Sequence, residues 1–495
     1  MRKYLYIGLL ALLLIGSNAY SQDIIPKGAF ITAAYATGGS SQHKDKVLWL
    51  TWGAQSVYDT YGKHNVQIVN GSASYAKIDL GGGRFLKIAA VISNLEYASG
   101  KGWSSVPEWG GYLNSYAPGN YSGDSMDDMY NIGGTGTRNK LISGLRNTQI
   151  AGQVRFTITA KATIEDKPVR LSGMVIGDAE SLAEKEQFYA IGSGDWTIVD
   201  LQKNLSKGAY EVLKTKDAKG LTKLHFLNGN DKDTGAVAFM TFNNDAYKGN
   251  GYEVQFDVYL KGGGLTAIAL GLIPPSLDMG DAPESYGDAI HMLESYVPTN
   301  DNVSVNEVSD REPVKVNLNS DAYKVGNLQS GINNYLGTTA ADGDTQKMYS
   351  KDALGDDNSG TAVPNEEDAW PEKLRRFSHK LFYKKGDKIE AEIGYTAFKE
   401  GWISGWIDFN QNGVFDDDER VTVFAPKADK GSVKMVWTVP VNRVIRSTFV
   451  RLRFGYNESE VKSPIGIATG GEVEDHKIYI LGPARSNPML PNKSR

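Results

Sequence analysis

Alternation of apolar and polar side chains is the feature that most constrains the fold of this chain. Eight segments read as strands, most of them with this alternation: 67–70, 85–92, 154–160, 252–260, 388–394, 401–407, 433–438 and 449–454. A period of two puts successive side chains on opposite faces of a strand, so one face can be buried while the other remains exposed to solvent. Regular helical spacing is missing, and glycine triplets at 81–83 and 262–264 read as turns. The pattern predicts an all-β protein built from β-sandwiches or jelly rolls.

Pro274-Pro275 interrupts this pattern where the charge balance changes. Residues 276–495 contain 26 basic against 34 acidic side chains, whereas the preceding part contains 27 against 24. A chain of 495 residues is long enough for two substantial cores. We predict one sandwich over residues 22–273 and a second β-sandwich-like domain with long acidic loops over 276–481, followed by a basic tail over 482–495.

The first residues read as an export signal. A basic start at residues 2–3 precedes an apolar run over 5–15, and the Ala-Tyr-Ser sequence at 19–21 resembles a cleavage site. The apolar run is too short to cross a hydrocarbon core of about 30 Å. We predict a signal peptide over residues 1–21, a secreted or cell-surface protein, and no transmembrane segment after cleavage.

Composition and motif content exclude several functional classes. The chain has no cysteine, which removes thiol catalysis, cysteine-based zinc sites and disulfides. Its net charge of −5 offers no broad basic field, so we expect no nucleic-acid partner. The nucleophile-elbow, zincin, P-loop and dinucleotide-binding motifs are all missing from the sequence, and we predict that the protein is not an enzyme.

The strongest local motif lies between residues 408 and 419. It matches the calcium-loop pattern D-x-[DN]-x-[DN]-G-x5-E at every defined position. In such a loop the chain curls around the ion, and a glycine at position 6 permits the sharp turn. The predicted Ca²⁺ ligands are Asp408, Asn410, Asn412, Val414, Asp416 and Glu419. Because strand patterns flank the motif, we predict a calcium loop within a β-hairpin; the alternative is a solvated acidic turn.

Further acidic motifs occur along the C-terminal half. They are Gly280-Asp-Ala-Pro283 with Ser285-Tyr-Gly287, Gly355-Asp-Asp357, and Gly471-Glu-Val-Glu-Asp475. In a strand, Glu472 and Glu474 fall on one face. Two adjacent carboxylates repel unless a cation intervenes, although charge on an exposed edge strand also protects against aggregation. The spacing alone leaves both explanations open.

These motifs, together with Trp406–Gly413 and in this order, resemble the GEVED domain, a β-rich module of large bacterial surface proteins. The chain departs from the family pattern at residues 365–369 and at His476, where the family usually has a tyrosine. The resemblance covers about 276–481. It implies metal ligands, with calcium as the expected ion, at Asp281, Asp356, Asp357, Glu472, Glu474 and Asp475.

The N-terminal half also resembles a known family. Ala36-Thr-Gly-Gly39, the stretches 44–53 and 121–131, and Val175–Ser181 are similar to the CshA-type non-repetitive adhesin domain. The similarity spans about 27–272. It implies a lectin-like β-sandwich that serves attachment to external surfaces.

The segment between residues 95 and 139, rich in Gly, Ser, Tyr and Trp, is the candidate ligand surface. Exposed aromatic rings give rigid contact area and can stack on a sugar or a peptide. The candidate ligand-binding residues are Trp103, Trp109, Tyr112, Tyr121, Asp124 and Tyr130. The alternative is that several of these rings pack the segment onto the sandwich.

Together these features predict a secreted adhesin-type protein that binds an extracellular glycan or a matrix or host protein. Its second domain would be stabilised by Ca²⁺, and a surface-anchoring partner is left open. One alternative is a structural surface-layer or scaffold protein. Another is a carboxylate-pair glycoside hydrolase, for which Asp124 and Glu108 are the candidate pair. Ligand binding without bond cleavage would separate the adhesin from both.

Overall fold

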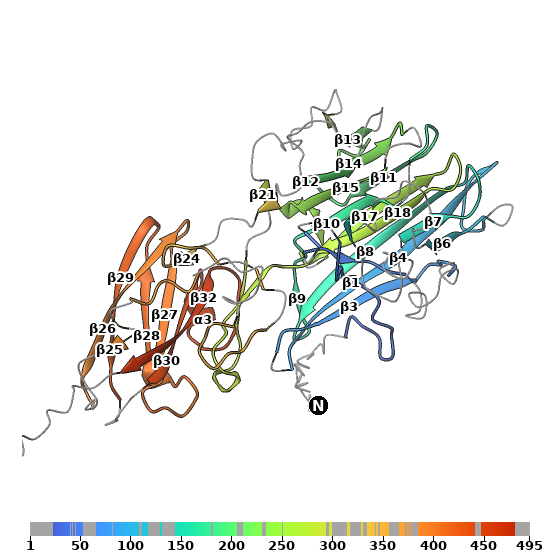
Figure 1. The fold of residues 1–495 in the computed structure, drawn as a ribbon. Helices are drawn as coiled ribbons and strands as arrows, with labels where there is room; N and C mark the ends of the chain where they lie inside the picture. Colours follow the sequence, from blue (N-terminus) through green and yellow to red (C-terminus); the bar gives the residue numbers. More distant parts are fainter. Residues whose placement is uncertain are drawn as a thin grey trace, which may run out of the picture.

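Two groups of β-sheets make up the computed structural model, one formed mainly by β1 to β18 and one by the later strands (Figure 1). The structure describes residues 23–52, 66–107, 111–116, 129–130, 144–204, 211–229, 234–293, 297–298, 314–316, 328–329, 334–355, 366–371, 374–377, 385–440 and 447–480, less 40, 42, 45, 82, 180–181, 250, 342, 345–346 and 375. The predicted signal peptide and basic tail lie outside these residues.

The first unit is a sandwich of an eight-stranded and an eleven-stranded sheet. The smaller sheet contains β1 (Ala34–Tyr35), β2 (Leu48–Trp49), β6 (Leu113–Tyr116), β7 (Gly144–Asn147), β10 (Gly173–Asp178), β12 (Trp196–Asn204), β15 (Thr234–Phe242) and β18 (Ala267–Ile273). The larger contains β3 (Ala73–Asp79), β4 (Phe85–Ser99), β5 (Gly102–Ser104), β8 (Gln153–Ile164), β9 (Lys167–Val169), β11 (Gln187–Gly192), β13 (Glu211–Lys216), β14 (Thr222–Leu227), β16 (Tyr247–Lys248), β17 (Glu253–Lys261) and β22 (Val314–Val316). The long central strands pair antiparallel, as a sandwich of this kind requires.

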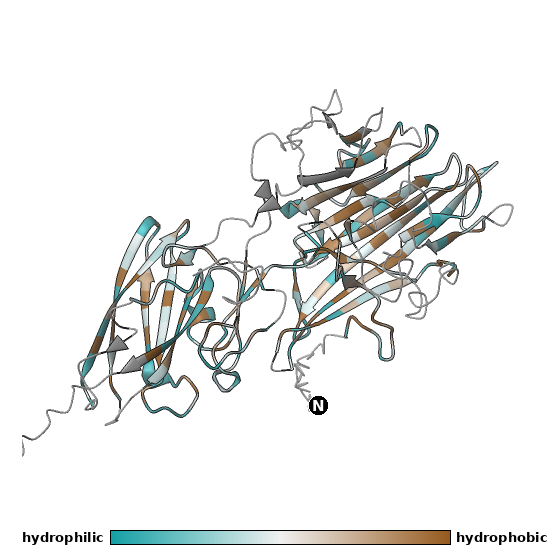
Figure 2. Ribbon diagram, in the orientation of Figure 1, coloured by the Kyte–Doolittle hydropathy of each residue, from teal (hydrophilic) through white to brown (hydrophobic). Residues whose placement is uncertain are grey.

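The period of two decides which side chains enter the core between these sheets. Ile88, Ile158 and Val258 point inward from the larger sheet and meet Met240 and Leu270 from the smaller one. Figure 2 shows the alternation as bands of brown and paler colour along the long strands. Each fully buried side chain of this size contributes about 1.5–3 kcal/mol, so the alternating pattern is what holds the sandwich together.

A second apolar cluster covers the opposite face of the smaller sheet. All six residues of β10 are buried, because its outer face is also covered. Trp49, Val175 and Phe239 from this face pack with Met129 and Tyr130. Met129 and Tyr130 are therefore held by core packing.

The second unit is a smaller sandwich. One sheet contains β24 (Tyr335–Leu336), β26 (Lys388–Ala397) and β29 (Ala428–Thr438); the other, in spatial order, contains β25 (Arg376–Phe377), β32 (Glu472–Ile480), β30 (Ser447–Gly455), β27 (Gly401–Ile407) and β28 (Arg420–Ala425). Ile393 and Met435 from the first sheet share a core with Ile403 and Leu452 from the second.

Short elements complete the described chain. They are the strands β19 (Leu277–Met279), β20 (Ala289–Met292), β31 (Gly466–Ala468), β21 (Val297–Pro298) and β23 (Leu328–Gln329), the α-helix α3 (Glu458–Val461), and the 3₁₀-helices η3 (Asn244–Ala246), η4 (Glu284–Tyr286) and η7 (Asp417–Glu419). Across the described residues, no helix has the length and apolar character needed to cross a bilayer.

The all-β prediction and the two sandwiches are confirmed. Seven of the eight expected strands lie in β4, β8, β17, β26, β27, β29 and β30. The strand expected over residues 67–70 is wrong, since only Gln67 makes an isolated bridge, to Asn114. The chain turns directly afterwards at Gly71, whose φ of 92° lies in the left-handed region, and this turn ends the pairing.

The two units interlock across the boundary predicted at Pro274-Pro275. Leu277, Met279 and Ile290, which follow it, belong to the core of the first unit. β22 also follows it and pairs with β13 in the larger sheet of the first unit, while β31 of the second unit pairs in parallel with β20. Chain from after the boundary thus contributes to both units.

A buried ion pair joins the units. Arg84, in the turn between β3 and β4, donates to the Asp288 carboxylate and to Glu165 Oε1 at 2.9 Å. The side chain of Asp288 is only 2% exposed and also accepts a hydrogen bond from the Tyr349 hydroxyl. A carboxylate this well buried depends on its partners to offset its lost hydration.

We expect Arg84→Ala to lower the free energy of unfolding by about 2–4 kcal/mol, because the buried Asp288 carboxylate loses its ion-pair partner. Chemical denaturation of the whole chain measures this. Lys87→Ala is the matched control, since Lys87 pairs with Asp23 and Asp166, which are both about half exposed, and should cost less than about 1 kcal/mol. Equal losses in the two variants would contradict the prediction.

Candidate functional site

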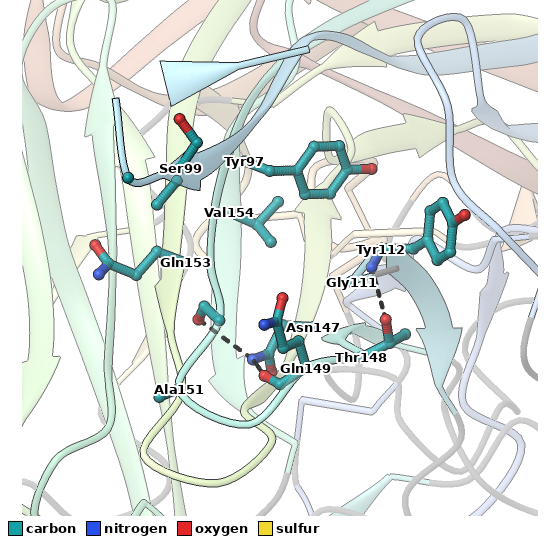
Figure 3. A pocket seen from close by; sticks show the side chains of 13 residues that line it. Tyr97, Ser99, Gly111, Tyr112, Asn147, Thr148, Gln149, Ala151, Gln153 and Val154 are labelled. Atoms are coloured by element: carbon teal, nitrogen blue, oxygen red, sulfur yellow. Dashed lines mark hydrogen bonds between the residues drawn. The ribbon is translucent and has the colours of Figure 1, made fainter. Parts of the chain in front are cut away.

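A polar pocket lies at one end of the first sandwich, where β4 and β8 of the larger sheet come close to the β6–β7 strand pair (Figure 3). Its volume is about 270 Å³, and it is lined by Tyr97, Ala98, Ser99, Gly100, Gly111, Tyr112, Asn147, Thr148, Gln149, Ala151, Gly152, Gln153 and Val154. Amide, hydroxyl and tyrosine side chains dominate this lining. None of the thirteen carries a formal charge at neutral pH.

Hydrogen bonds fix the shape of this pocket. Asn147 Nδ2 donates to the carbonyl of Gln149 at 2.8 Å, and its Oδ1 accepts from the Thr266 amide at 2.6 Å. The Tyr112 amide donates to Thr148 Oγ1 at 2.6 Å. The walls are therefore set before any ligand arrives, which lowers the entropic cost of binding.

Three of the six predicted ligand residues lie among the described residues, and they differ in exposure. Tyr112 is 37% exposed and lines the pocket. Trp103 is half-buried on the neighbouring hairpin strand β5, with the Arg155 guanidinium 4.4 Å from its ring centre and Tyr259 against its edge. The other three, Trp109, Tyr121 and Asp124, lie outside the described residues, as do Glu108 and most of the segment between residues 117 and 143.

Tyr130 is a core residue. Its side chain is fully buried, its ring packs edge-on against Trp49 at 4.8 Å, and its hydroxyl accepts a hydrogen bond from Ser41 at 2.9 Å. This burial leaves no surface for an external ligand, so it corrects the expectation for Tyr130. The packing alternative raised from the sequence describes this ring.

A larger cavity of about 860 Å³ lies between the two units and was not anticipated from the sequence. Arg170, Tyr247 and Tyr252 line it from the first unit, and Met292 and Ile467 from the chain that follows. The Arg170 guanidinium lies 4.2 Å from the Tyr247 ring centre. No sequence motif marks this cavity, because its walls are brought together only by the contact between the units.

The 408–419 loop connects β27 to β28, which pair antiparallel, so the prediction of a hairpin at this position is confirmed. Gly413 has a φ of 81°, the left-handed conformation that the sixth loop position needs. Asn410 Nδ2 and Asn412 Nδ2 both donate to Asp416 Oδ2, at 2.6 and 2.9 Å. The Asp408 carboxylate accepts hydrogen bonds from the backbone amides of Asn412 and Gly413. Four of the predicted ligands are thus connected by hydrogen bonds within the loop.

Two carboxylates at the base of this loop are buried. Asp408 is fully buried and accepts from the Tyr286 hydroxyl at 2.7 Å, while Glu419 is 1% exposed and accepts from the amides of Phe409 and Asp416. Burial raises the pKa of Glu419 to about 7, and the nearby Asp408 charge adds to the rise. A set of carboxylate, amide and carbonyl oxygens on a curled backbone fits the oxygen-only coordination that Ca²⁺ prefers.

The 472–476 strand presents different chemistry on its two faces. Asp475 lies opposite Arg451 on one face, and Glu474 lies opposite Leu452 on the other. Arg451 and Asp475 are fully buried and form a bidentate pair, with Nε and Nη2 each 2.8 Å from a carboxylate oxygen. Burial opposes ionisation of Asp475, but the Arg451 charge outweighs it and lowers the pKa of Asp475.

Arg451 also ties distant segments together. It donates to the carbonyls of Gly287 and Pro464, each at 2.9 Å, while the Ala282 amide donates to Asp475 at 2.8 Å. The Gly280–Gly287 motif is therefore fixed to the 472–476 strand through this pair. The Asp475 carboxylate thus accepts hydrogen bonds from an arginine and from a backbone amide.

The remaining predicted ligands accept backbone amides. Glu472 accepts from Leu336 and from Ala341, the latter at 3.0 Å, and Asp281 accepts from Gly355. Glu474 accepts from Ala369 at 2.9 Å. Burial, followed by the charges of Glu474 and Asp278, raises the pKa of Glu472. Asp356 and Asp357 lie outside the described residues.

Sequence reasoning missed the partners of these carboxylates. Arg451 lies in an ordinary alternating strand, and His476 stands out in the sequence only as a departure from a motif. Glu367 belongs to an acidic run that gave no sign of its partner. Arg451 and Glu367 lie on other segments than the side chains they meet on β32, and only the register between β30 and β32 brings Arg451 to Asp475.

Comparison with known proteins agrees with the two sequence resemblances. Residues 45–273 match the family described as surface adhesin CshA non-repetitive domain 2, and residues 402–479 match the GEVED domain. The chain carries a CshA-type adhesin domain followed by a GEVED domain. Both resemblances, and their order, are thereby confirmed. No curated protein matches the sequence.

One solved structure found to be similar is the N-terminal domain of the Streptococcus gordonii adhesin Sgo0707. The alignment covers 91% of this chain and 88% of that chain, with 8% sequence identity and a TM-score of 0.28. Because the TM-score and the sequence identity are both this low, no property of that adhesin is transferred to the present chain. The adhesin-type domain content therefore rests on the family match in the CshA-type domain.

Removing a carboxylate from one face of β32 should lower the free energy of unfolding much more than removing one from the other face. Asp475→Asn should lower the free energy of unfolding by about 3–5 kcal/mol, because it leaves the buried Arg451 without its counter-charge. Glu472→Gln should cost about 1 kcal/mol, the loss of one amide hydrogen bond. Chemical denaturation of the whole chain compares them, and a larger loss for Glu472→Gln would contradict the assignment of charges to the two faces.

Proposed function

We propose that this protein is a secreted, cell-surface adhesin whose CshA-type domain binds an extracellular glycan at the polar pocket near Tyr112. The observation that carries the proposal is the lining of that pocket, which combines amide and hydroxyl groups with tyrosine rings and includes no formal charge. Neutral hydroxyls of a sugar hydrogen-bond to such groups, and its apolar ring face packs on an aromatic side chain.

The size of the pocket limits what enters it. A volume of about 270 Å³ is slightly below the roughly 300–1,000 Å³ of typical small-molecule sites. We therefore expect a terminal sugar unit to occupy the pocket while the rest of the ligand lies along the neighbouring surface, where Trp103 is half-buried. A matrix or host protein that presents such a glycan would be bound through it.

Replacing Tyr112 or Trp103 by alanine should weaken glycan binding roughly 30-fold or more, the effect of losing an aromatic anchor of about 2 kcal/mol. The experiment probes the chain without residues 1–21 on glycan and matrix-protein arrays, then measures affinities for the bound species. Tyr252→Ala is the matched control, because Tyr252 is similarly exposed on the same domain but far along the chain from the pocket.

The melting temperature separates binding from packing. If Tyr112 contacts only the ligand, the melting temperature of Tyr112→Ala stays within a few degrees of the wild-type value. If Tyr112 packs the domain, the melting temperature falls together with binding. If both variants bind a confirmed ligand as the wild type does, the pocket is not the site. A protein that binds nothing on either array supports the scaffold alternative, and release of sugar from a bound glycan supports the hydrolase.

We propose that Ca²⁺ stabilises the GEVED domain at the 408–419 loop. Asp408, Asn410, Asn412, Asp416 and Glu419 would supply side-chain oxygens and Val414 its carbonyl. Support comes from the hairpin that carries the loop, from the conformation of Gly413, and from two carboxylates buried at its base. Bound Ca²⁺ would neutralise those carboxylates and fix the link between Asp408 and Tyr286.

Millimolar Ca²⁺ should raise the melting temperature of the GEVED domain. Extracellular sites of this kind often have dissociation constants of about 10⁻⁴–10⁻³ M, so about 1 mM Ca²⁺ adds about 0.4–1.4 kcal/mol by mass action. Calorimetry with CaCl₂ or EDTA measures the shift. Asp408→Ala should remove most of it, whereas Asp418→Ala, an exposed residue of the same loop, should keep it. A wild-type melting curve that does not respond to Ca²⁺ would contradict the proposal.

A further inference from the structure

Three ionisable side chains meet inside the sandwich of the GEVED domain. Glu474 and His476 lie two positions apart on β32 and therefore point to the same face. Glu367 reaches them from residues 366–371. The exposed fraction is 2% for Glu474, 3% for His476 and 5% for Glu367.

The donor atoms of this cluster are close together. One ligand atom from each residue lies within 4.8 Å of the others. His476 Nε2 is 2.8 Å from Glu474 Oε2 and 4.0 Å from Glu367 Oε2, so the imidazole faces both carboxylates. The Ala369 amide donates to Glu474 at 2.9 Å and holds that carboxylate in place.

The cluster lies on the apolar side of the strand. In the β30–β32 register, Glu474 is opposite Leu452 and His476 is opposite Val450, both of them core residues. The Trp370 ring lies 6.4 Å from the His476 ring. Arg451 is opposite Asp475 and therefore projects from the other face, where its charge is already paired.

Two carboxylates inside an apolar core are unfavourable unless a positive charge compensates them. The residues that face the cluster from β30 are aliphatic, and a bound cation is one way to supply that charge. A metal ion bound between them would take one donor atom from each residue, because these atoms all lie within 4.8 Å of one another; it would replace the hydrogen bond between His476 Nε2 and Glu474 Oε2.

We propose that Glu367, Glu474 and His476 bind a first-row transition-metal ion, with Zn²⁺ as the ion that this donor set fits best. An imidazole with carboxylates is typical of zinc, whereas Ca²⁺ takes oxygen ligands only. The site is separate from the 408–419 loop and does not depend on a ligand of the CshA-type domain. Its function would be structural, fixing residues 366–371 to β32.

The test uses the chain without residues 1–21, stripped of metal with a chelator and then kept in excess Ca²⁺ so that calcium-loop effects stay constant. Zn²⁺ is titrated by calorimetry, and Co²⁺ is titrated by visible absorption, which reports nitrogen and oxygen ligation directly. We expect one Zn²⁺ per chain, a Co²⁺ absorption spectrum, and a rise in melting temperature with Zn²⁺.

His476→Gln and Glu367→Gln should each weaken Zn²⁺ binding at least about 100-fold, since even residues that only orient metal ligands contribute 10–100-fold. Glu367→Gln changes a residue outside the strands and keeps the test valid if His476→Gln fails to fold. His291→Gln is the matched control: His291 is also fully buried but faces Arg453 and the Gly470 carbonyl, so its removal should leave the metal stoichiometry unchanged.

Three results would overturn the proposal. One is a wild-type chain that binds neither Zn²⁺ nor Co²⁺ and keeps the same melting curve, as expected if a protonated His476 pairs with the two glutamates. A second is Zn²⁺ binding that both variants retain, which places the ion elsewhere. A third is Zn²⁺ that binds the metal-stripped chain but is displaced by the excess Ca²⁺, which indicates a site made of oxygens alone.

Discussion

The buried pair between Arg451 and Asp475 is the interaction on which the second domain depends. Its two hydrogen bonds join neighbouring strands, and the same guanidinium holds the carbonyls of Gly287 and Pro464. Segments that lie more than 160 residues apart along the chain therefore meet at one side chain. Because desolvated charges tolerate no substitute partner, this contact fixes one arrangement of the strands and excludes shifted registers.

The alternation of a single strand explains why the GEVED motif contains so many acids. Asp475 meets a buried arginine on one face of β32, whereas Glu472 and Glu474 lie on the other face, where they accept the amides of Leu336 and Ala369. The two glutamates bind the backbone of β24 and of residues 366–371, neither of which forms strand pairs with β32. The motif is thus a set of anchoring points for long loops, and a protein rich in such loops needs several of them.

The sequence predicted what local periodicity determines. Strands such as β17 and β27 and the hairpin around residues 408–419 follow from side-chain alternation and from turn residues. It could not predict contacts that depend on register between strands, such as Arg451 with Asp475, or contacts with a segment outside the strands, such as His476 with Glu367. Nor could it separate Tyr130 from Tyr112, because an aromatic residue looks the same in sequence whether it packs against Trp49 or lines a pocket.

The return of β22 to the first sandwich has a practical meaning for anyone who isolates that sandwich. A recombinant piece that stops at residue 273 would leave β13 as an open sheet edge, and open edges recruit other chains. It would also lack Leu277, Met279 and Ile290, whose side chains fill the same core. A piece that keeps these contacts must extend to about residue 316, beyond the end of the family match at residue 273.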